Sequence, residues 1–429
     1  MFMLESHLSS DQSRVVAEVQ AAATRANLSV FLTGGAMRDM LGGFPILEID
    51  FTVEGNAVKL GHTIAKKAGA KVVSEDDNRK VVHLLFPAGV HATIGMARQE
   101  KYPKPGAKPD VRPTSIHEDL RGRDFTINSI ALSLNPASRG LLLDPNNGVG
   151  DLERKELRAI SNYTLYDDPV RLLRMLRFKV RLGFNIDERT KLQYDNAREA
   201  KLEEHIPERD LLEELRHTAN EPNCADIVRL LHDEKLLSLY SSALTGAKLN
   251  LPGLLKLQKA RQMVPFGVDM HLEPMGLFLY FLADALPVKD KAALIKQVGL
   301  SKKEVDQWQR LEAKSKKLEK DLKSAKLQKP SHVYLALFKA AGDQILFLLA
   351  HTQQRIVHDR IRNYLQKYLP SAQEVTEKDV LATGARAGTP KFQKAREELI
   401  LTRLDARPKK APPPAETPTG PVSALARRT

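Results

Sequence analysis

Hydrophobic and polar residues recur with two different spacings along the chain, and each spacing predicts a different kind of secondary structure. In 1–27, Val15, Val16 and Val19 recur at helical spacing, so an N-terminal helix is expected. From 28 to 150, short β-branched apolar runs alternate with helical segments. Strands are expected at 28–33, 48–53, 71–73, 81–86 and 91–96, and helices at 36–41 and 56–70. Such a mixture predicts an α/β or an α+β domain.

Helical patterns dominate the remainder of the chain. Strand signals almost vanish after Asp151, and helices are expected at 169–182, 208–219, 224–237, 301–327, 331–341, 343–369 and 390–404. Residues 405–429 are rich in proline, alanine and threonine, so a disordered tail is expected there. The predicted parts are an N-terminal helix (1–27), a head (28–150), a helical neck (151–220), a helical body and tail (221–404) and the terminal tail (405–429).

Two segments of the head carry local signals of their own. The stretch 102–113 contains four prolines and a glycine, which predicts a loop. Arg98, Glu100 and Tyr102 precede or begin it, either as a packed corner or as part of a flexible catalytic loop. The segment 124–132 is expected to be helical. Its expected core residues are Phe125, Ile127, Ile130 and Leu132.

Composition and charge narrow the class of protein. The chain of 429 residues has 66 lysines and arginines against 53 acids, a formal net charge of +13, which permits a polyanionic partner. The single cysteine, Cys224, excludes a disulfide framework and a cysteine-rich zinc site. We find neither an apolar run of roughly 18 residues nor a secretory signal, so a cytoplasmic protein is expected. The charge-dense segment 302–329 is a solvated helix face or an RNA-facing surface.

The segment 31–55 carries the strongest chemical signal. A strand is expected to end at Gly34 and Gly35, and a helix to begin there. Glycines let the backbone approach a ligand closely, and free N–H groups at a helix start attract phosphate. Arg38 lies three residues into the helix, where its guanidinium fork suits a phosphate, and Asp39 is placed to orient that fork. The turn therefore predicts a phosphate-binding site.

Two carboxylates follow this turn. Glu48 and Asp50 are two residues apart on an expected strand, so both side chains emerge on one face. Adjacent carboxylates are costly unless a cation neutralises them, and Mg²⁺ prefers one or two carboxylates together with phosphate oxygens. The pair beside a phosphate-binding turn predicts two-metal nucleotidyl transfer. One ion activates the attacking hydroxyl, and the other holds the leaving pyrophosphate.

The expected helix at 169–182 has an unusual polar side. At about 100° per residue, its arginines fall on one side and its leucines on the other. The arginines are Arg171, Arg174, Arg177 and Arg181. Because the stripe contains no acid, it favours an anion-binding surface over a solvated face. Asp168, just before Pro169, is expected as the N-cap of this helix, and it can also present its side chain to a base, since the two roles do not exclude each other.

Taken in order, these motifs resemble the class II tRNA nucleotidyltransferase/poly(A) polymerase family of the polymerase β superfamily. GGAMRDMLGGFPILEID matches the glycine turn and acid pair of the family, and ARQEKY and RGRDFTINSIAL match its R-x-E-x-Y loop and RRDFTINA motif. LLDPNNGVGDL, DDPVRLLRMLRFKVRLGF and ERDLLEEL match its DP-x-x-G-x-x-DL, EDP-x-R and ER-x-x-x-EL motifs. The segment 375–405 is similar to its TG-x-DL closing segment. The resemblance spans about residues 30–405.

The resemblance implies a polymerase β-like nucleotidyltransferase head with a mixed sheet, followed by an all-α neck, body and tail. It also implies roles for matching residues. Glu48 and Asp50 are the implied Mg²⁺ ligands and, with Arg38, the implied catalytic residues. The implied nucleotide-binding residues are Gly34, Gly35, Arg38, Asp39, Arg123, Asp124, Asn128, Asp167, Asp168, Arg171, Arg174 and Arg177. Among these, Asp168 and Arg171 read the incoming base.

Four positions depart from the pattern of the family. Glu48 stands where the family usually has aspartate, and Thr93 stands where a third acid is common. Gly122 replaces one arginine of an arginine pair, and Asp167 replaces glutamate. These departures bear on metal geometry, affinity and nucleotide choice rather than on the fold.

The activity implied by the resemblance is addition of CCA, or part of it, to the 3′ end of tRNA from CTP and ATP, with release of pyrophosphate. The expected partners are the 3′ end and acceptor arm of tRNA, CTP and ATP, with Mg²⁺ as cofactor and no membrane. A poly(A) polymerase is the alternative within the family. A non-catalytic RNA-binding protein on the same scaffold is the alternative of another class. Retention of Arg38, Asp50, Asp124 and Arg171 argues for catalysis.

Overall fold

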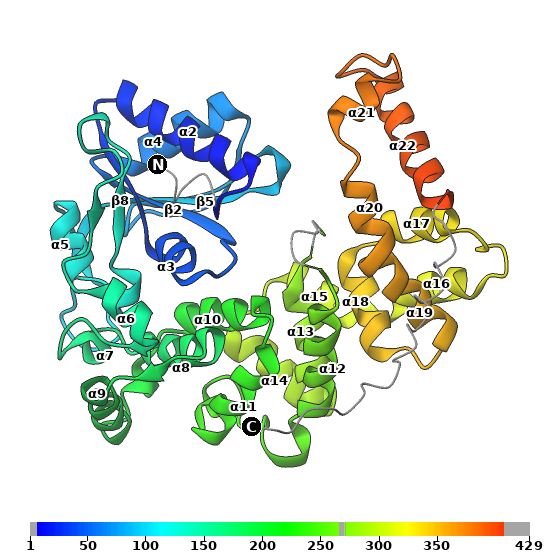
Figure 1. Ribbon diagram of the computed structural model, residues 1–429. Helices are drawn as coiled ribbons and strands as arrows, with labels where there is room; N and C mark the ends of the chain where they lie inside the picture. Colours follow the sequence, from blue (N-terminus) through cyan, green and yellow to red (C-terminus); the bar gives the residue numbers. More distant parts are fainter. Residues whose placement is uncertain (1–6, 266–269, 271, 407–429) are drawn as a thin grey trace, which may run out of the picture. The chain divides into compact units, whose positions relative to one another are not determined.

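The structure, a computed structural model, describes residues 7–265, 270 and 272–406. The chain divides into two compact units, Met1–Gln258 with Pro274–Gln309 and Lys259–Glu273 with Arg310–Thr429 (Figure 1). The domain boundaries expected from the sequence stay predictions. The disordered tail expected at 405–429 lies, apart from its first two residues, outside the described residues.

A seven-stranded sheet forms the centre of the head, with strand order β3-β4-β5-β2-β1-β8-β9. Its strands are β1 (Ser29–Thr33), β2 (Glu48–Glu54), β3 (Lys71–Asp76), β4 (Val81–Leu85), β5 (His91–Met96), β8 (Ala131–Ser133) and β9 (Leu142–Leu143). Neighbouring strands are antiparallel except β2 and β5, which are parallel. The expected mixed sheet is confirmed, because each predicted strand had its own apolar run.

Helices cover both faces of this sheet. In the head they are α2 (Ser10–Arg25), α3 (Gly34–Gly42), α4 (Ala57–Ala68), α5 (Ile116–Arg121) and α6 (Gly148–Arg154). Figure 1 shows α2 and α4 on one face and α3 on the other. The expected N-terminal helix packs against α4 and β1 through Val15, Val16 and Val19, which are all buried. The turn between β1 and α3 therefore lies against a rigid layer.

The register of the central strands aligns three polar side chains across the sheet. Asp50 on β2 is opposite Thr93 on β5, and Thr93 is opposite His83 on β4. Since residues in register on paired strands point to the same face, the three side chains lie in one row. Glu48, two residues before Asp50 on β2, belongs to the same face.

Two expectations for the head are wrong in part. The stretch expected as a loop at 102–113 ends in β7 (Asp110–Pro113), which pairs with β6 (Arg98–Lys101) as an antiparallel hairpin. A proline is tolerated there because the strand lies at an edge. The segment expected as a helix at 124–132 is a short 3₁₀ turn, Thr126–Asn128, followed by β8. Pairing of β8 with β1 overrides the local helical spacing. The four expected core residues are nevertheless buried: Phe125, Ile127, Ile130 and Leu132.

Helices dominate after the head, as expected. In the first unit they are α7 (Thr164–Asp167), α8 (Val170–Leu182), α9 (Glu188–Glu199), α10 (Glu208–Asn220), α11 (Cys224–Asp233), α13 (Pro274–Leu282), α14 (Val288–Val298) and α15 (Lys302–Gln309), with the small strands β10 (Glu156–Leu157) and β11 (Asn185–Ile186). Helix α10 packs on α8, α11, α13 and α14. The sequence patterns did not predict α7, α9, α13 and α14.

The second unit is also helical. Its helices are α16 (Leu311–Lys323), α17 (Pro330–Phe338), α18 (Gly342–His351), α19 (Arg355–Asn363), α20 (Leu369–Gln373), α21 (Glu377–Leu381) and α22 (Pro390–Asp405), and α12 (Leu251–Gln262) lies at the boundary in sequence. A π-helical turn, Tyr364–Tyr368, connects α19 to α20. The helices expected at 301–327 and 343–369 are each divided. In α16, Leu311, Leu318 and Leu322 are buried while the lysines are exposed, so its charged side is solvated.

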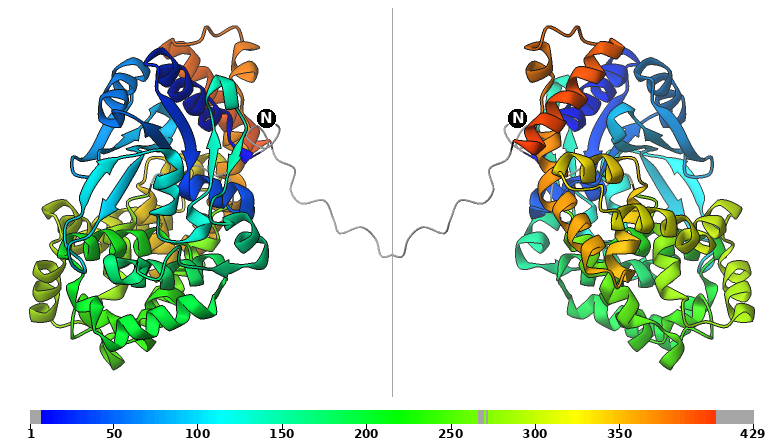
Figure 2. Two further views of the ribbon diagram at one scale, coloured as in Figure 1. Left: turned by 90° about the vertical axis from the view of Figure 1, so that its left-hand side faces the viewer. Right: turned by 90° about the vertical axis from the view of Figure 1, so that its right-hand side faces the viewer.

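Helix α8 is fixed by its arginines, and Figure 2 shows it beneath the sheet of the head. Arg177 is 4% exposed and donates to Glu214 and Glu221 over distances of 2.6 and 3.0 Å. Arg174 donates to Asp124 of the head over 2.8 Å. The arginine stripe expected to bind anions is therefore occupied, over much of its length, by carboxylates of the protein itself.

Within the described ranges, no single helix has both the length and the apolar character needed to cross a bilayer. Helices α17 and α18 meet that criterion only as a pair with a bend of 115° between them.

We expect Glu214→Ala to destabilise the protein strongly. The substitution leaves the buried guanidinium of Arg177 with one carboxylate instead of two, and loss of one partner of a buried ion pair costs about 3–5 kcal/mol. Urea denaturation followed by circular dichroism measures the loss.

Glu213→Ala is the matched control for this experiment. Glu213 lies on the same helix and pairs with Arg216, but its side chain is 49% exposed. Exposed pairs contribute about 0–1 kcal/mol. Equal losses in the two variants would contradict the structural role of the Arg177 pair.

Candidate active site

The site begins at the turn from β1 into α3. Gly34 has φ of +62°, a left-handed conformation that favours glycine. A β-carbon at Gly34 would lie 3.3 Å from Asp50 Oδ2, and one at Gly35 would lie 3.1 Å from the same atom. The two glycines therefore let the turn pack directly on the carboxylate. The Ala36 N–H donates to Asp50 Oδ2 over 3.3 Å.

Glu48 and Asp50 have different electrostatic surroundings. Burial raises the pKa of Asp50 to about 7, and the charge of Glu48 adds to the shift. Burial also acts on Glu48, but the nearby His83 imidazole and a hydrogen bond from Thr93 outweigh it and lower the pKa of Glu48. A cation would relieve the repulsion between the two carboxylates. Within the described residues, no group of three or more histidine, cysteine, aspartate or glutamate side chains forms a metal site.

Arg38 lies beneath the glycine turn. Its side chain is 4% exposed, and its Nη2 would lie 3.5 Å from a β-carbon at Gly35. Arg38 Nε donates to Asp39 Oδ1 and Arg38 Nη1 donates to Asn128 Oδ1, each over 2.8 Å. Arg181 Nη2 donates to the other carboxylate oxygen of Asp39 over 2.8 Å. Asp39 thus orients Arg38, while contact of Arg38 with a phosphate stays a prediction.

Arg123 approaches the turn from another side. Its Nη1 would lie 3.2 Å from a β-carbon at Gly34. Arg123 Nη2 donates to Asp119 Oδ2 and to Thr52 Oγ1, both over 2.8 Å. Gly122 ends α5 next to it, with only backbone carbonyls at 3.6 Å from its β-carbon position, so a larger side chain fits there.

Asp124 connects the head to α8. Its Oδ2 accepts from Arg174 Nε and Nη2 over 2.9 and 2.8 Å, and its Oδ1 accepts from Asn128 Nδ2 over 3.0 Å. Burial opposes the charge of Asp124, but Arg174 and Arg171 keep its pKa well below the usual value. Asp124, Asn128 and Arg38 therefore form one hydrogen-bonded group.

Asp168 belongs to a second polar group. The N-cap of α8 is Pro169 and receives no side-chain hydrogen bond, so Asp168 is not the N-cap. Asp168 Oδ2 accepts from the Tyr102 hydroxyl over 3.2 Å and lies 3.6 Å from Arg171 Nε. Tyr102 also donates to Glu100 over 2.7 Å. Of the two interpretations of this region, the packed corner fits the structure.

Asp39, Asp124, Asn128 and Arg174 belong to the hydrogen-bonded group around Arg38, and the other predicted residues fall into three sets. The structure brings the glycine turn, the acid pair, Arg38 and Arg123 together, and it brings Asp168 together with Arg171. Asp167 is half-buried beside Asp168, and burial raises its pKa. Arg177 lies apart, enclosed by its two glutamates. A nucleotide contact of Arg177 stays a prediction, and its observed partners give it a structural role.

Sequence reasoning missed His83, Thr52 and Asp119. His83 Nδ1 lies 3.1 Å from Thr93 Oγ1 and 3.7 Å from Glu48 Oε1. The only sequence signal for His83 was a polar residue in the middle of an apolar strand. Its relation to Glu48 depends on strand register, which no local pattern reveals.

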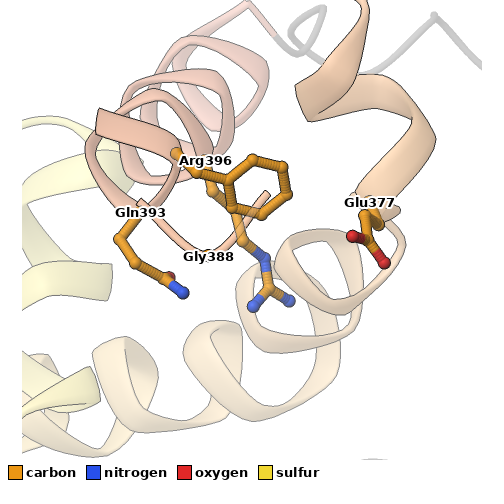
Figure 3. Close-up of a pocket in the computed structure, with 5 residues that line it drawn as sticks. Glu377, Gly388, Gln393 and Arg396 are labelled. Carbon is orange, nitrogen blue, oxygen red and sulfur yellow. The ribbon is translucent and has the colours of Figure 1, made fainter. Parts of the chain in front are cut away.

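The second unit contains a cavity of about 370 Å³. Figure 3 shows Gln393 and Arg396 extending from α22 and Glu377 from α21, and Gly388 and Phe392 complete the lining. The cavity belongs to the segment that resembles the closing segment of the family. None of the predicted site residues lines it.

Comparison with known proteins identifies the domain family of the head. Residues 30–158 match the poly A polymerase head domain. The A-adding tRNA nucleotidyltransferase of Aquifex aeolicus is 29% identical over 344 residues, which are 79% of this chain and 40% of that protein. The Multifunctional CCA protein of Xanthomonas campestris pv. campestris is 31% identical over 295 residues, 66% of each chain. The chain belongs to the class II tRNA nucleotidyltransferase/poly(A) polymerase family.

The similarity of fold extends beyond the head. A solved structure described as a tRNA-processing enzyme, apo form I, superposes with a TM-score of 0.52 at 25% identity, covering 93% of this chain and 99% of that one. The expected class of fold is confirmed. The chain spans less than half the length of several curated tRNA nucleotidyltransferases that it matches, the Aquifex protein among them. Enzymes of this family generally use a divalent metal ion.

We expect the Asp50 carboxyl of the metal-free protein to titrate with a pKa of about 7. Between pH 3.8 and about 7 the folded state keeps a proton that the unfolded chain has lost, so the stability of the metal-free protein falls as pH rises through this range. Carbon-13 NMR of labelled aspartate measures the pKa directly.

Two variants test the cause of this shift. Glu48→Gln should lower the pKa of Asp50 by removing a neighbouring negative charge. Asp50→Asn should abolish the loss of stability between pH 3.8 and about 7. A pKa near 4 in the wild-type protein would refute the asymmetry between the two carboxylates.

Proposed function

We propose that this protein is a tRNA nucleotidyltransferase that transfers CMP, AMP or both from CTP and ATP to the 3′ end of tRNA, releasing pyrophosphate. The observation that carries the proposal is the packing of the glycine turn directly on Asp50, with Glu48 on the same strand face. This arrangement sets the proposed phosphate-binding turn beside a carboxylate pair in which burial and the charge of Glu48 raise the pKa of Asp50. The name of the Aquifex relative, A-adding tRNA nucleotidyltransferase, supports tRNA as the acceptor.

Mg²⁺ is the proposed cofactor, with Glu48 and Asp50 as its protein ligands. The residues fit such an ion because hard carboxylate oxygens are what Mg²⁺ prefers, and because the raised pKa of Asp50 reflects unrelieved burial and repulsion. When bound, a divalent ion supplies activation of the attacking 3′-hydroxyl and neutralisation of the pyrophosphate leaving group.

The residues around the pair position the nucleotide. The backbone of Gly34 and Gly35 and the guanidinium of Arg123 bind the triphosphate, while Arg38 supports the turn from below. Positioning and charge neutralisation supply most of the rate enhancement in such transfers, so no general base is required among these side chains. Asp124, Asn128 and Arg174 support the ribose side of the site.

Base selection is assigned to Asp168 and Arg171. A carboxylate accepts and a guanidinium donates, so together they match the donor and acceptor edges of cytosine and adenine. Tyr102 holds Asp168 through its hydroxyl, and the contact of 3.6 Å between Asp168 and Arg171 keeps both groups at one place. Asp167 supports this pair from the preceding residue.

The tRNA acceptor arm binds to the basic surface of the helical parts. The excess positive charge favours phosphate contacts, and an A-form duplex is recognised chiefly by shape and backbone. The exposed lysines of α16 are one candidate surface for this contact. Such an enzyme would act in the cytoplasm.

Extension of three tRNA transcripts tests the proposed activity. The transcripts end before CCA, after the first C and after CC, and each is incubated with Mg²⁺ and labelled CTP, ATP or both. Stepwise addition that stops after CCA indicates a complete enzyme, and use of only one kind of end indicates a CC- or A-adding specialist. A long ladder of AMP on any RNA would indicate a poly(A) polymerase instead. No incorporation, with tRNA binding intact, would leave the RNA-binding alternative.

Asp50→Asn should reduce turnover by at least about 10²–10³-fold, because it removes a charge that stabilises the transition state through the bound ion. Binding of tRNA in a gel-shift assay should not change. Asp77→Asn is the control, since the side chain of Asp77 is 87% exposed and lies away from the acid pair. Undiminished incorporation by Asp50→Asn would exclude the acid pair as the catalytic centre.

Asp168→Asn should relax base selection. The substitution exchanges one acceptor oxygen for a donor, and one mismatched buried hydrogen bond costs about 1–3 kcal/mol, or roughly 10- to 100-fold in kcat/KM. Competition between CTP, ATP, UTP and GTP in the extension assay measures the change. Asp195→Asn, on the surface of α9 with a side chain 53% exposed, should leave selectivity as it was. Unaltered selectivity in Asp168→Asn would assign base reading to other residues.

A further inference from the structure

We propose that His83 and Thr93 are positioning residues that orient the carboxylate of Glu48 for metal binding. The inference rests on the proposed function, because it concerns the same acid pair. It assigns a role to a histidine that the proposed mechanism does not use and to a threonine at a position where the sequence lacks an acid.

The geometry comes from three neighbouring strands. Thr93 on β5 lies between Asp50 on β2 and His83 on β4 in the register of the sheet. The Thr93 hydroxyl donates to Glu48 Oε1, and the same hydroxyl lies 3.1 Å from His83 Nδ1. His83 Nδ1 is also 3.7 Å from Glu48 Oε1. Both side chains therefore contact the same carboxylate oxygen, and Oε2 has no such contact from either.

A positioned carboxylate matters more for glutamate than for aspartate. Glutamate has one more rotatable bond than aspartate, so ordering its carboxylate costs more side-chain entropy. A hydrogen bond that already orders Oε1 removes part of this cost before an ion arrives. Groups that hydrogen-bond to metal ligands usually orient them and tune their affinity. The arrangement thus compensates for the longer side chain at position 48.

Two observations favour positioning over direct coordination by His83. The imidazole Nδ1 that faces the pair is already within hydrogen-bond distance of Thr93. Within the described residues, His83, Glu48 and Asp50 do not form a three-ligand group. The lowered pKa of Glu48 agrees with this arrangement, since its hydrogen bonds with His83 and Thr93 favour the charged carboxylate.

The test measures binding of Mn²⁺ to the full-length protein in the absence of tRNA. Binding is monitored as the decrease of the electron paramagnetic resonance signal of free Mn²⁺. Thr93→Val removes the hydroxyl at nearly constant volume, and His83→Leu removes the imidazole. Each should weaken Mn²⁺ binding by about 10- to 100-fold, the usual effect of removing such a supporting group. Thr93→Ser keeps the hydroxyl and should restore wild-type affinity, which a purely structural role of Thr93 would not predict.

His62→Leu is the matched control. His62 also contacts a glutamate, Glu75, over 2.9 Å, but this pair lies on α4 and β3 rather than on the strands of the acid pair. The Mn²⁺ affinity of the His62→Leu variant should equal that of the wild type. Thermal unfolding of every variant identifies any general loss of folding, and Thr93→Ser remains informative where Thr93→Val is unstable.

Two results would overturn the proposal. Wild-type Mn²⁺ affinity in both folded Thr93→Val and folded His83→Leu would exclude a role in positioning Glu48. A nitrogen coupling from His83 to bound Mn²⁺ in pulsed resonance spectra would make His83 a ligand instead. Metal binding that responds to the variants while the wild type incorporates no nucleotide would refute the proposed activity but support the positioning role. Nucleotide incorporation by the wild type, together with Mn²⁺ affinity that does not change in Thr93→Val and His83→Leu, would support the proposed activity but refute the positioning role.

Discussion

The structure of the first unit depends on ion pairs between the arginines of α8 and carboxylates of the protein. Burial of a guanidinium is costly unless other groups replace its hydration. Arg177, the buried arginine of α8, has two carboxylate partners. Arg177 is paired within the helical neck, whereas Arg174 and Arg181 are paired with Asp124 and Asp39 of the head. One helix thereby fixes the orientation of the glycine turn and of the 3₁₀ turn beside it. The arginine stripe of α8, which the sequence predicts to bind anions, is thus mostly paired with carboxylates of the protein itself.

The acid pair of the candidate site and the arginine that supports the glycine turn differ in exposure. Glu48 is partly exposed, while Arg38 beneath the turn is almost completely buried. Arg98, Glu100 and Tyr102 connect the β6–β7 hairpin to Asp168 through a series of hydrogen bonds. Asp168, which is proposed to read a base, is therefore held by the same unit that holds the acid pair.

The sequence predicted those features that are encoded locally. Strands β2 and β5 and the acid pair were found because alternation and an i, i+2 spacing require only a few residues. The hairpin partner β7 and the strand β8 were missed because pairing with a distant strand decides them. For the same reason, nothing in the sequence around Arg177 indicates Glu214, which lies 37 residues away. His83 was overlooked because its neighbour Thr93 is determined by sheet register.

The order of the chain within the two units has a consequence for biosynthesis. Residues 274–309 return to the first unit after an intervening segment that belongs to the second. Helices α13 and α14 from this stretch pack on α10, the helix that carries Glu214. While the ribosome is still short of residue 309, that surface of α10 has no partner. Completion of the first unit must therefore wait for nearly three quarters of the polypeptide, and a nascent chain passes through a stage with exposed apolar helix surface that is vulnerable to aggregation.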